Sequence, residues 1–276
     1  MTVAVSCNLA DGVILGVDSA VTLPSPRGVL KVYEHAEKLF QLGEKPIGIA
    51  TFGEGAIGAR SIGSYIREFE IANPNNVITR PSTMKDVVEA LRLFFLQVYQ
   101  NTVIPAIESQ TGKKFEEIPD DQKPVLGLAV GGFSHGAYLS EVWEILIPFC
   151  QTPNSAKLWH GQGEFGSVWF ALNEPIYRYV KGYDRGLLGE LKNYFTQLRG
   201  SNFTSQEEAQ ISNILQKYEY PIPFVAMPMQ EGVAYVRFLV EMVINHHRFA
   251  LGAPIVGGKA HIGLVTYKGE KFQIIE

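Results

Sequence analysis

The sequence contains few cysteines and carries little net charge. Only two of its 276 residues are cysteines, Cys7 and Cys150, and 19% of its residues are charged. Two cysteines are too few for a disulfide framework, and a buried thiol in a reducing compartment behaves as a small hydrophobic side chain. The net charge of −4 provides no basic surface to attract nucleic acid or an anionic membrane. We therefore expect neither nucleic acid nor a membrane as a partner.

Signals for export and for membrane insertion are also missing. The first lysine or arginine is Arg27, and the acidic residues Asp11 and Asp18 precede it, so the basic start of a secretory signal is absent. The longest uncharged run, residues 124–140, is rich in glycine and serine around residues 131–136 and is typical of a hairpin. Because an export signal and a disulfide framework are both absent, we expect a cytoplasmic location.

The usual cofactor signatures are absent as well. No G-x-x-x-x-G-K-[ST] phosphate-binding loop occurs, and residues 53–58 match the dinucleotide pattern G-x-G-x-x-G only superficially. A dinucleotide fold needs a parallel βαβ unit, whereas antiparallel hairpins are predicted before these glycines, so we interpret them as the entry to a helix. The six histidines lack metal-ligand spacing, since adjacent His246 and His247 cannot face one metal from a helix. We therefore expect no cofactor and no metal.

The chain is long enough to bury a large hydrophobic core. Hydrophobic residues make up 46% of the sequence, and 276 residues suit one large domain or two small ones. No change in composition, flexible linker or internal repeat divides the chain. We therefore expect a single domain over residues 1–276, with residues 183–223 as a helical elaboration.

Strand patterns and helix patterns alternate in blocks along the chain. Alternating or β-rich segments predict strands at residues 2–8, 13–19, 38–42, 47–52, 125–131, 137–147, 157–159, 260–267 and 271–275. Helical spacing predicts helices near residues 57–69, 87–98, 166–172, 187–199, 205–217 and 231–249. A loop containing Pro24, Pro26 and Gly28 is expected after the second strand. Because hairpins dominate, we expect an α+β fold with antiparallel sheets and helices on their outer faces.

The search for a nucleophile leads to the amino terminus. No G-x-S-x-G motif is present, and Cys7 lies within a predicted strand, where a packed thiol is expected. Thr2 is a small second residue of the kind after which the initiator Met1 is commonly removed. Removal would place a hydroxyl and a free α-amine on one residue. An α-amine with a pKa of about 7.7 to 8.0 can accept the hydroxyl proton near neutral pH.

Lys38 is the candidate cation beside this amine. A fixed positive charge nearby lowers the pKa of an amine and favours its basic form. A threonine at position 2 is uninformative by itself, however, because many proteins begin in this way. Asp18 and Lys38 can equally form an ordinary solvated pair worth less than about 1 kcal/mol. These residues alone leave a structural and a catalytic interpretation open.

The residues around Thr2 resemble a known family. Residues 2–19, TVAVSCNLADGVILGVDS, resemble the start of mature proteasome β-subunits and their bacterial relatives, which are N-terminal-nucleophile hydrolases. In that family a nucleophilic threonine precedes a D-G-V hairpin and then A-D-[ST], and the spacing from Thr2 to Asp18 matches without a gap. Residues 38–42, KLFQL, resemble the strand that carries the active-site lysine, and residues 49–53, IATFG, resemble the strand that ends in the oxyanion glycine.

This resemblance, which is specific over residues 2–60, implies a role for each matched residue. Thr2 Oγ would attack the scissile carbonyl, and the Thr2 amine would carry the proton. Lys38 would stabilise the deprotonated nucleophile, and Asp18 would orient Lys38. The Gly53 amide would bind the developing oxyanion. The implied fold is a four-layer αββα sandwich of two antiparallel sheets.

The function implied by the resemblance is that of a threonine-type amidohydrolase, expected to be a peptidase. Its substrate would be a peptide or another amide, and no cofactor is implied. Members of the family assemble into rings or open spirals that enclose their sites, which implies a self-compartmentalised homo-oligomer. The sequence has no phosphate-binding loop, so any ATPase that feeds the assembly would be a separate chain.

Two segments depart from the family pattern. Residues 161–163, GQG, place Gln162 where the family has a supporting serine. Residues 253–258, APIVGG, lose the Asp and Ser of the family's D-x-x-S-G-G, with Val256 in the place of the serine. The length of the chain and its Met-Thr start resemble the bacterial ancestral-type (Anbu-like) proteasome homologues. The departures leave two alternatives open, a catalytically silent scaffold or assembly subunit and a non-proteolytic acyl or amide hydrolase on the same scaffold.

Overall fold

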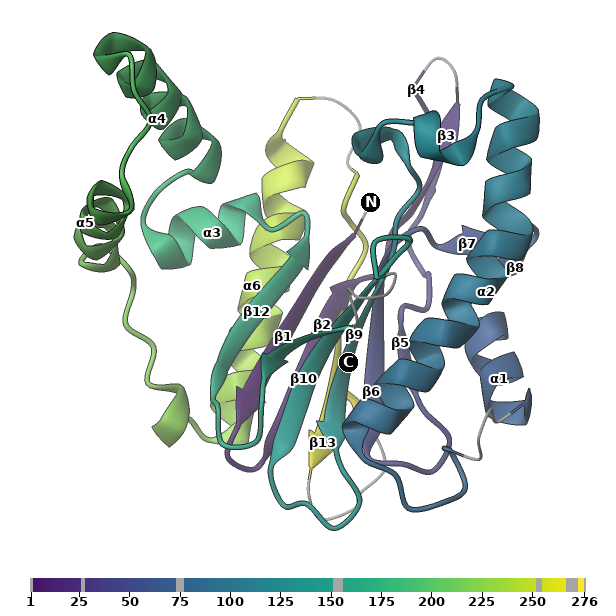
Figure 1. Cartoon of the computed structure of the whole chain (residues 1–276). Coiled ribbons are helices and arrows are strands. Elements are labelled where there is room, and N and C mark those ends of the chain that lie inside the picture. Colours follow the sequence, from purple (N-terminus) through teal and green to yellow (C-terminus); the bar gives the residue numbers. More distant parts are fainter. Residues whose placement is uncertain are drawn as a thin grey trace.

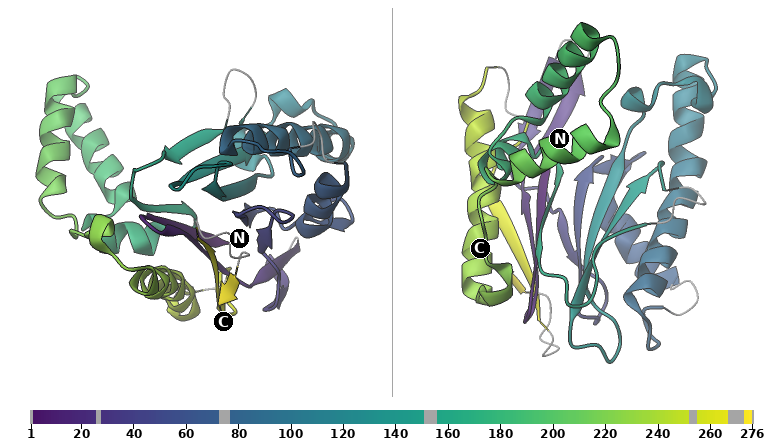
Figure 2. Two further views of the ribbon diagram at one scale, coloured as in Figure 1. Left: turned by 90° about the horizontal axis from the view of Figure 1, so that it is seen from below. Right: turned by 60° about the vertical axis from the view of Figure 1, so that its left-hand side comes forward.

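Two five-stranded sheets lie face to face at the centre of the molecule, and helices cover the outer face of each (Figures 1 and 2). The computed structural model describes residues 2–25, 28–72, 77–150, 156–251, 255–266 and 273–275. All strand pairs in this part of the chain are antiparallel. The structure is therefore an α+β, four-layer αββα sandwich, as the sequence predicted.

The first sheet contains the amino-terminal hairpin at its centre. In spatial order it consists of β12 (Gly166–Ala171), β1 (Val3–Leu9), β2 (Gly12–Asp18), β13 (Ala260–Thr266) and β14 (Gln273–Ile275). Strands β1 and β2 are buried along their whole length, because one face packs against helices and the other packs against the second sheet. The amino end of the chain is therefore enclosed by structure on both sides.

The second sheet packs on the inner face of the first. In spatial order it consists of β11 (Lys157–His160), β10 (Ser140–Ile147), β9 (Leu126–Phe133), β6 (Ile47–Gly53) and β5 (Leu39–Gln41). Hydrophobic side chains such as Val13, Leu15 and Ala129 fill the space between the sheets. Phe52 of β6 stacks on Phe170 of β12, with ring centroids 5.2 Å apart. Side chains at corresponding strand ends can therefore meet across this layer.

Four helices cover the sandwich, two on each side. Those on the second sheet are α1 (Ile62–Ala72) and α2 (Met84–Thr111), and those on the first are α3 (Glu174–Lys181) and α6 (Met229–Phe249). Helix α2 begins with a capping box in which Thr83 and Asp86 exchange hydrogen bonds. Val236 and Val240 of α6 pack closely over Gly16 of β2, because a glycine there lets the helix approach the sheet.

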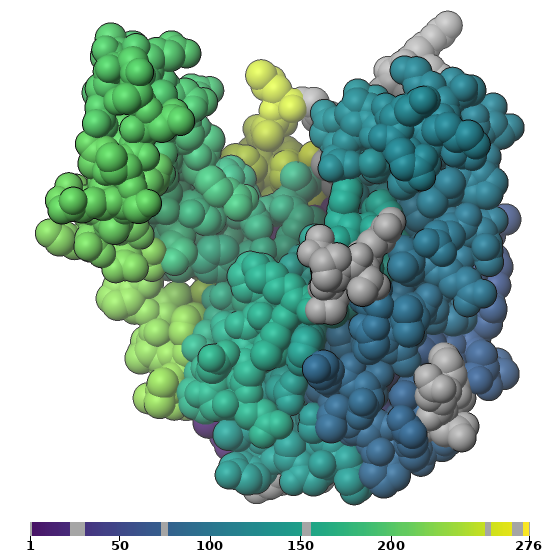
Figure 3. All heavy atoms as spheres, viewed as in Figure 1, coloured from purple at the N-terminus to yellow at the C-terminus, as the bar shows by residue number. Residues whose placement is uncertain are grey.

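Two further helices stand away from the sandwich. α4 (Arg185–Arg199) and α5 (Ser205–Gln216) have no buried residues and project from the body, as the space-filling view shows (Figure 3). They are joined to each other by an ion pair between Lys192 and Glu208. We call these two helices the arm. The arm lies within residues 183–223, where the sequence predicts a helical elaboration.

Residues 166–172 do not form the predicted helix. They contain strand β12, which pairs with β1 along its length. Val168 and Phe170 are buried while Ser167 and Trp169 are less so, an alternation typical of a strand. A short apolar run can form a helix or a strand. Here the β-branched and aromatic residues favour a strand, and so does the edge of β1, which β12 pairs with.

The loop predicted after the second strand is a hairpin instead. β3 (Val21–Ser25) pairs with β4 (Gly28–Tyr33) in a two-stranded ribbon. Pro24 is accommodated because the register shifts between Leu23 and Pro24, and proline is tolerated at such an irregularity in an edge strand. Pro26 lies outside the described residues.

Helix α1 begins later than the spacing predicts. Ile57 belongs to a small hairpin of β7 (Ala56–Ile57) and β8 (Arg60–Ser61), and the helix begins at Ile62. Ile57 is nevertheless buried in the same cluster as the apolar residues of α1, which explains why its spacing resembled theirs. Helix α3 was not predicted, because eight residues give too little periodicity to recognise.

Three 3-10 turns complete the described elements: η2 (Phe115–Glu117), η3 (Asp120–Gln122) and η4 (Phe224–Ala226). Residue 267 of one predicted strand and residues 271 and 272 of the last predicted strand lie outside the described residues. Within the described residues, none of the helices combines the length and the apolar character needed to cross a lipid bilayer.

Candidate active site

Thr2 is held at the start of β1, at one end of the first sheet. The residue is buried, with 4% of its surface exposed, and its carbonyl oxygen accepts a 3.2 Å hydrogen bond from the Leu172 amide. Leu172 directly follows β12, the strand that pairs with β1. The amino end is therefore tied into the sheet, whereas an untied chain end would fray.

Lys38 connects Thr2 to Asp18. Its ammonium nitrogen Nζ donates hydrogen bonds of 2.9 Å to Thr2 Oγ1 and of 2.9 Å to Asp18 Oδ1. Asp18 is fully buried at the end of β2, and Lys38 is 6% exposed just before β5. Thr2 and Asp18 thus belong to the first sheet and Lys38 to the second. The cluster forms only where the two sheets face each other.

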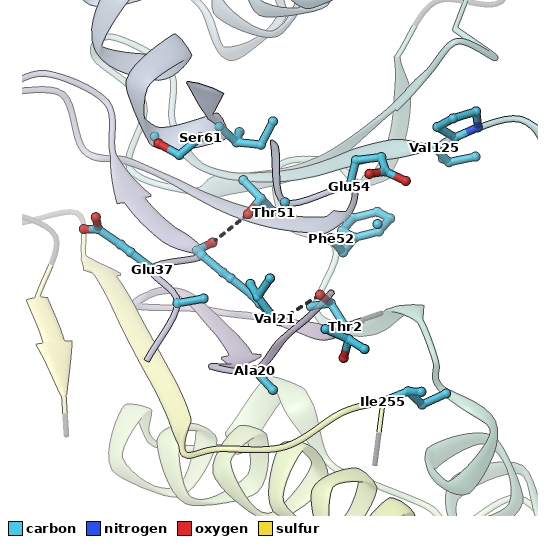
Figure 4. Close-up of a pocket in the computed structure, with 18 of the residues that line it drawn as sticks. Thr2, Ala20, Val21, Glu37, Thr51, Phe52, Glu54, Ser61, Val125 and Ile255 are labelled. Carbon is cyan, nitrogen blue, oxygen red and sulfur yellow. Dashed lines mark hydrogen bonds between the residues drawn. The ribbon is translucent and has the colours of Figure 1, made fainter. Parts of the chain in front are cut away.

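The backbone of β6 holds Lys38 in place. The Thr51 amide donates a 2.8 Å hydrogen bond to the Lys38 carbonyl oxygen, and the Thr51 hydroxyl donates to the same oxygen at 3.4 Å. In Figure 4 dashed lines mark the bond from Thr51 on one side and the bond to Thr2 on the other. The position of the ammonium group is therefore set from the second sheet.

The carboxylate of Asp18 accepts hydrogen bonds from four donors. Oδ1 accepts from Lys38 Nζ at 2.9 Å and from the Val3 amide at 3.2 Å. Oδ2 accepts from the Ala20 amide at 3.2 Å and from the Gly257 amide at 3.3 Å. Gly257 is 239 residues away from Asp18 in the sequence. These donors hold the carboxylate in one orientation beside Lys38.

Burial influences the protonation of Lys38. Removal from water lowers the pKa of Lys38 below its ordinary value, and the charge of Asp18 and its hydrogen bond act in the opposite direction. The pair therefore supplies a positive charge directly beside the Thr2 hydroxyl, and this charge is more easily lost than that of a free lysine.

Among the described residues, no group of three or more His, Cys, Asp or Glu side chains is placed to hold a metal ion.

Gly53 ends β6 at a position where only glycine fits. Its φ is +80°, and a Cβ atom there would lie 2.0 Å from the Val125 carbonyl oxygen. Gly53 lines a cavity of about 900 Å³ together with Thr2 and Lys38. Lys38 thus contacts both Thr2 and Asp18, and the fourth residue singled out from the sequence, Gly53, lies in the wall of the cavity that Thr2 and Lys38 border.

Gln162 does not lie beside Thr2, and the interpretation drawn from the sequence is wrong on this point. Gln162 follows β11 and donates a 3.0 Å hydrogen bond to Glu141, in a turn that contacts Asn8 at the opposite end of β1. The segment that reaches Thr2 is the end of β12, where Leu172 follows. The resemblance is weak in this part of the chain, and a short glycine motif matched the wrong turn.

The glycine-rich turn near the carboxyl end does reach the site. Val256 is fully buried, and the Gly257 amide is one of the four donors to the carboxylate. Close by, the Lys259 amide donates a 2.8 Å hydrogen bond to the hydroxyl of Ser19, next to Asp18 in sequence. Sequence reasoning missed the contacts of Gly257 and Ser19, and only the glycine pair of the family motif pointed to this turn. Residues 253 and 254 lie outside the described residues.

No protein-family model and no curated protein matches this sequence. Among solved structures, the chain is similar to an Anbu (Gly-1) mutant from Hyphomicrobium sp. strain MC1, with a TM-score of 0.52 and 10% sequence identity. The likeness covers 100% of this chain and 85% of that chain. The chain therefore shares the overall fold of that Anbu structure. At this level of identity the likeness concerns the arrangement of the elements, and it leaves activity and assembly to be argued from the site.

Proposed function

We propose that this protein is a threonine-type N-terminal-nucleophile amidohydrolase that cleaves peptides, with Thr2 as the nucleophile. The observation that carries the proposal is the buried contact of Lys38 Nζ with Thr2 Oγ1 and Asp18 Oδ1, each at 2.9 Å. A hydroxyl that accepts a hydrogen bond from a fixed ammonium group is stabilised when it loses its proton, which a threonine nucleophile requires. An ordinary surface pair would be solvated and would not be directed at a hydroxyl beside a cavity.

In this proposal, removal of Met1 supplies the base. Met1 lies outside the described residues. While it is attached, the nitrogen of Thr2 is an amide and cannot accept a proton. Once the nitrogen is a free α-amine, it takes the hydroxyl proton as Thr2 Oγ1 attacks the carbonyl carbon. Lys38 stabilises the negative charge on Oγ1, and Asp18 keeps Lys38 in position.

The remaining steps use the same groups. The Gly53 amide binds the carbonyl oxygen as this oxygen gains negative charge. The tetrahedral intermediate collapses when the protonated α-amine gives its proton to the leaving nitrogen, and an ester forms between the acyl group and Thr2 Oγ1. A water molecule, deprotonated by the α-amine, then hydrolyses the ester and restores the free threonine.

Intact mass combined with a covalent inhibitor tests the proposal. We expect the purified protein to lack Met1 and to form one adduct per chain with a peptide epoxyketone, which reacts with a hydroxyl and an α-amine of the same residue. Thr2→Ala should form no adduct and should lose turnover. Retention of Met1 by the whole sample, or full turnover by Thr2→Ala, would contradict the mechanism.

A catalytically silent scaffold is the second candidate, and the turn near the carboxyl end favours it. Val256 is fully buried where the family motif has a serine, so this position supplies no hydroxyl to the site. If the protein is a scaffold, Thr2→Ala and Lys38→Ala should leave any measured turnover unchanged. A non-proteolytic amide hydrolase predicts turnover of small amides in a screen in which peptides are not cleaved.

We further propose that residues 1–276 form one domain that assembles into a ring or spiral of identical subunits. The contribution of both sheets to the Thr2 cluster supports a single domain. Large apolar side chains are exposed along α4 of the arm, and another copy could cover them: Leu187, Leu191, Tyr194, Phe195 and Leu198. The low cysteine content supports a cytoplasmic location.

Light scattering after size-exclusion chromatography tests the role of the arm. We expect the double substitution Leu191→Glu and Leu198→Glu to shift the protein to a smaller species, because charge on this apolar stripe would have to be buried on assembly. Glu190 is exposed on the same helix, and Glu190→Gln serves as a control that should leave the mass of the assembly unchanged. An unchanged mass for the double variant would contradict the role of the arm.

A further inference from the structure

Two lysines that line the cavity beside Thr2 already have acidic partners. Lys38 Nζ lies 2.9 Å from Asp18. Lys123 Nζ lies 2.7 Å from Asp120. Each ammonium charge is therefore offset by a neighbouring carboxylate. The remaining positive charge in the cavity is that of the Thr2 α-amine, which in the proposed mechanism is partly protonated near neutral pH.

Two glutamates line the same cavity without an ion-pair or hydrogen-bond partner among the described residues, although burial raises the pKa of Glu54 and the charge of the amino terminus lowers it. Within the described ranges, the side chains of Glu37 and Glu54 form no ion pair and no hydrogen bond. Glu37 precedes Lys38 and Glu54 follows Gly53, so each is next to a proposed site residue in the sequence. Figure 4 shows Glu37 and Glu54 on opposite sides of Thr51. A carboxyl group without an ion-pair partner among the described residues therefore lies on each side of Thr51.

The wall of the cavity between the two carboxylates is largely apolar. It includes the side chains of Val21, Phe40, Phe52, Ile62 and Val125. Lysine and arginine suit such a surface, because their aliphatic stems pack on apolar walls while their charged ends reach a carboxylate. A leucine in the substrate would gain only the apolar contact, and a glutamate would meet charge of its own sign.

We propose that this cavity selects peptides with lysine or arginine beside the bond to be cut, and that Glu37 and Glu54 determine the preference. The inference rests on the proposed role of Thr2 as the nucleophile. The two carboxylates would act on a substrate side chain and not on the reacting bond. Their effect should therefore appear as a difference between substrates.

The test uses peptides that differ at one residue, which is arginine, leucine or glutamate. For the wild-type protein we expect kcat/KM to fall in the order arginine, leucine, glutamate. Glu37→Gln and Glu54→Gln should each lower the arginine-to-leucine ratio by up to about fivefold, the upper end of the range for exposed charge pairs, and the double variant should lower it further. Glu241→Gln removes the same charge from the exposed surface of α6 and should leave the ratio unchanged.

Salt dependence provides a second measurement on the same proteins. Because mobile ions screen exposed charges, raising the ionic strength should lower the arginine preference of the wild-type protein. The double variant should show a much smaller change. An arginine preference that is insensitive to salt and survives in the double variant would overturn the assignment of Glu37 and Glu54.

Binding separates the failure of this inference from the failure of the proposed function. Thr2→Ala protein should bind a labelled arginine peptide more tightly than the leucine peptide, and adding Glu37→Gln and Glu54→Gln should remove the difference. If the wild-type protein cleaves no peptide but this binding difference is found, the catalytic proposal fails and the charge selectivity stands. If it cleaves and binds arginine and leucine peptides equally, catalysis stands and the selectivity is overturned.

Discussion

Asn8 and Thr2 lie at opposite ends of β1, and each takes part in a buried polar contact between the two sheets. At Asn8 the groups are neutral. Its Nδ2 donates to the Glu164 carbonyl oxygen at 2.7 Å, and the Ser140 hydroxyl donates to Asn8 Oδ1 at 2.6 Å. Amide and hydroxyl groups that are satisfied in this way join buried surfaces without bringing a charge out of water.

At Thr2 the groups are ionic. Lys38 and Asp18 are both buried, and the ammonium group also contacts a hydroxyl that borders a cavity. Burial of an ammonium and a carboxylate carries a desolvation penalty that a neutral pair avoids, and the mutual attraction often does no more than offset it. The contacts at Asn8 show that neutral groups can join the sheets of this protein. The presence of charges at this end is consistent with the proposal that Thr2 is a nucleophile.

Substitutions at Lys38 should have the largest effect, and they test the difference between the two ends of β1 most directly. Lys38→Ala should lower kcat by about a thousandfold or more, because the charge beside Oγ1 is lost. It should also lower the free energy of unfolding by about 3 to 5 kcal/mol, because Asp18 is left buried without its partner. Turnover assays and denaturant unfolding measure the two effects.

A double variant separates these two effects of Lys38. Lys38→Met with Asp18→Asn removes both charges and should recover only part of the lost stability, because the NH2 group of an asparagine cannot accept from the backbone amides that the carboxylate binds. It should not recover activity. Recovery of turnover together with stability would show that the charges at this end serve the fold alone.

The pH dependence of turnover should reveal the ionic end. Below a pH of about 7.7, kcat/KM for a leucine peptide should rise about tenfold per unit, because the α-amine must lose its proton to act as a base. At high pH the rate should fall as Lys38 loses its proton. Burial lowers the pKa of Lys38, so this fall should begin below the ordinary value of 10.5. A profile that is flat between pH 6 and pH 8 would argue against the amine as the base.

Gly257 offers a smaller test of how the ionic end is held. Gly257→Pro removes the amide hydrogen that binds Asp18 Oδ2 and should lower kcat about tenfold, the effect of one hydrogen bond to a charged group. Gly257→Ala keeps the amide, and its Cβ would lie 3.7 Å from Ala20, an ordinary contact, so it serves as the control. Equal activity in both variants would mean that this donor does not position the carboxylate.

Asn8→Ala should have the smallest effect on turnover, and it tests the neutral end of β1. It leaves the Ser140 hydroxyl and the Glu164 carbonyl without their partner and should lower the free energy of unfolding by about 1 to 3 kcal/mol. The kcat of the folded protein should stay within about twofold of the wild type, since Asn8 lies at the far end of β1 from Thr2. A large loss of kcat without a loss of stability would contradict the division between the two ends.

Local patterns predicted most strands and helices because their signals lie in neighbouring residues. The alternation in the first two strands and the helical spacing of α6 are examples. The prediction of a helix at residues 166–172 was wrong because a six-residue strand takes its identity from the partner strand. The placement of Gln162 beside Thr2 was wrong for a related reason, since a glycine motif does not reveal which strand end it faces.

By itself, the sequence determined the amino-terminal hairpin and with it the proximity of Thr2 to Asp18. A two-residue turn sets Leu9 opposite Gly12, and this register carries the Val3 amide to the carboxylate at the other end. Only the tertiary structure decided that Lys38 reaches both residues from the second sheet and that the Gly257 amide completes the carboxylate's contacts. A hairpin register depends on a few neighbouring residues, whereas contacts across the sandwich depend on how all strands and helices pack together.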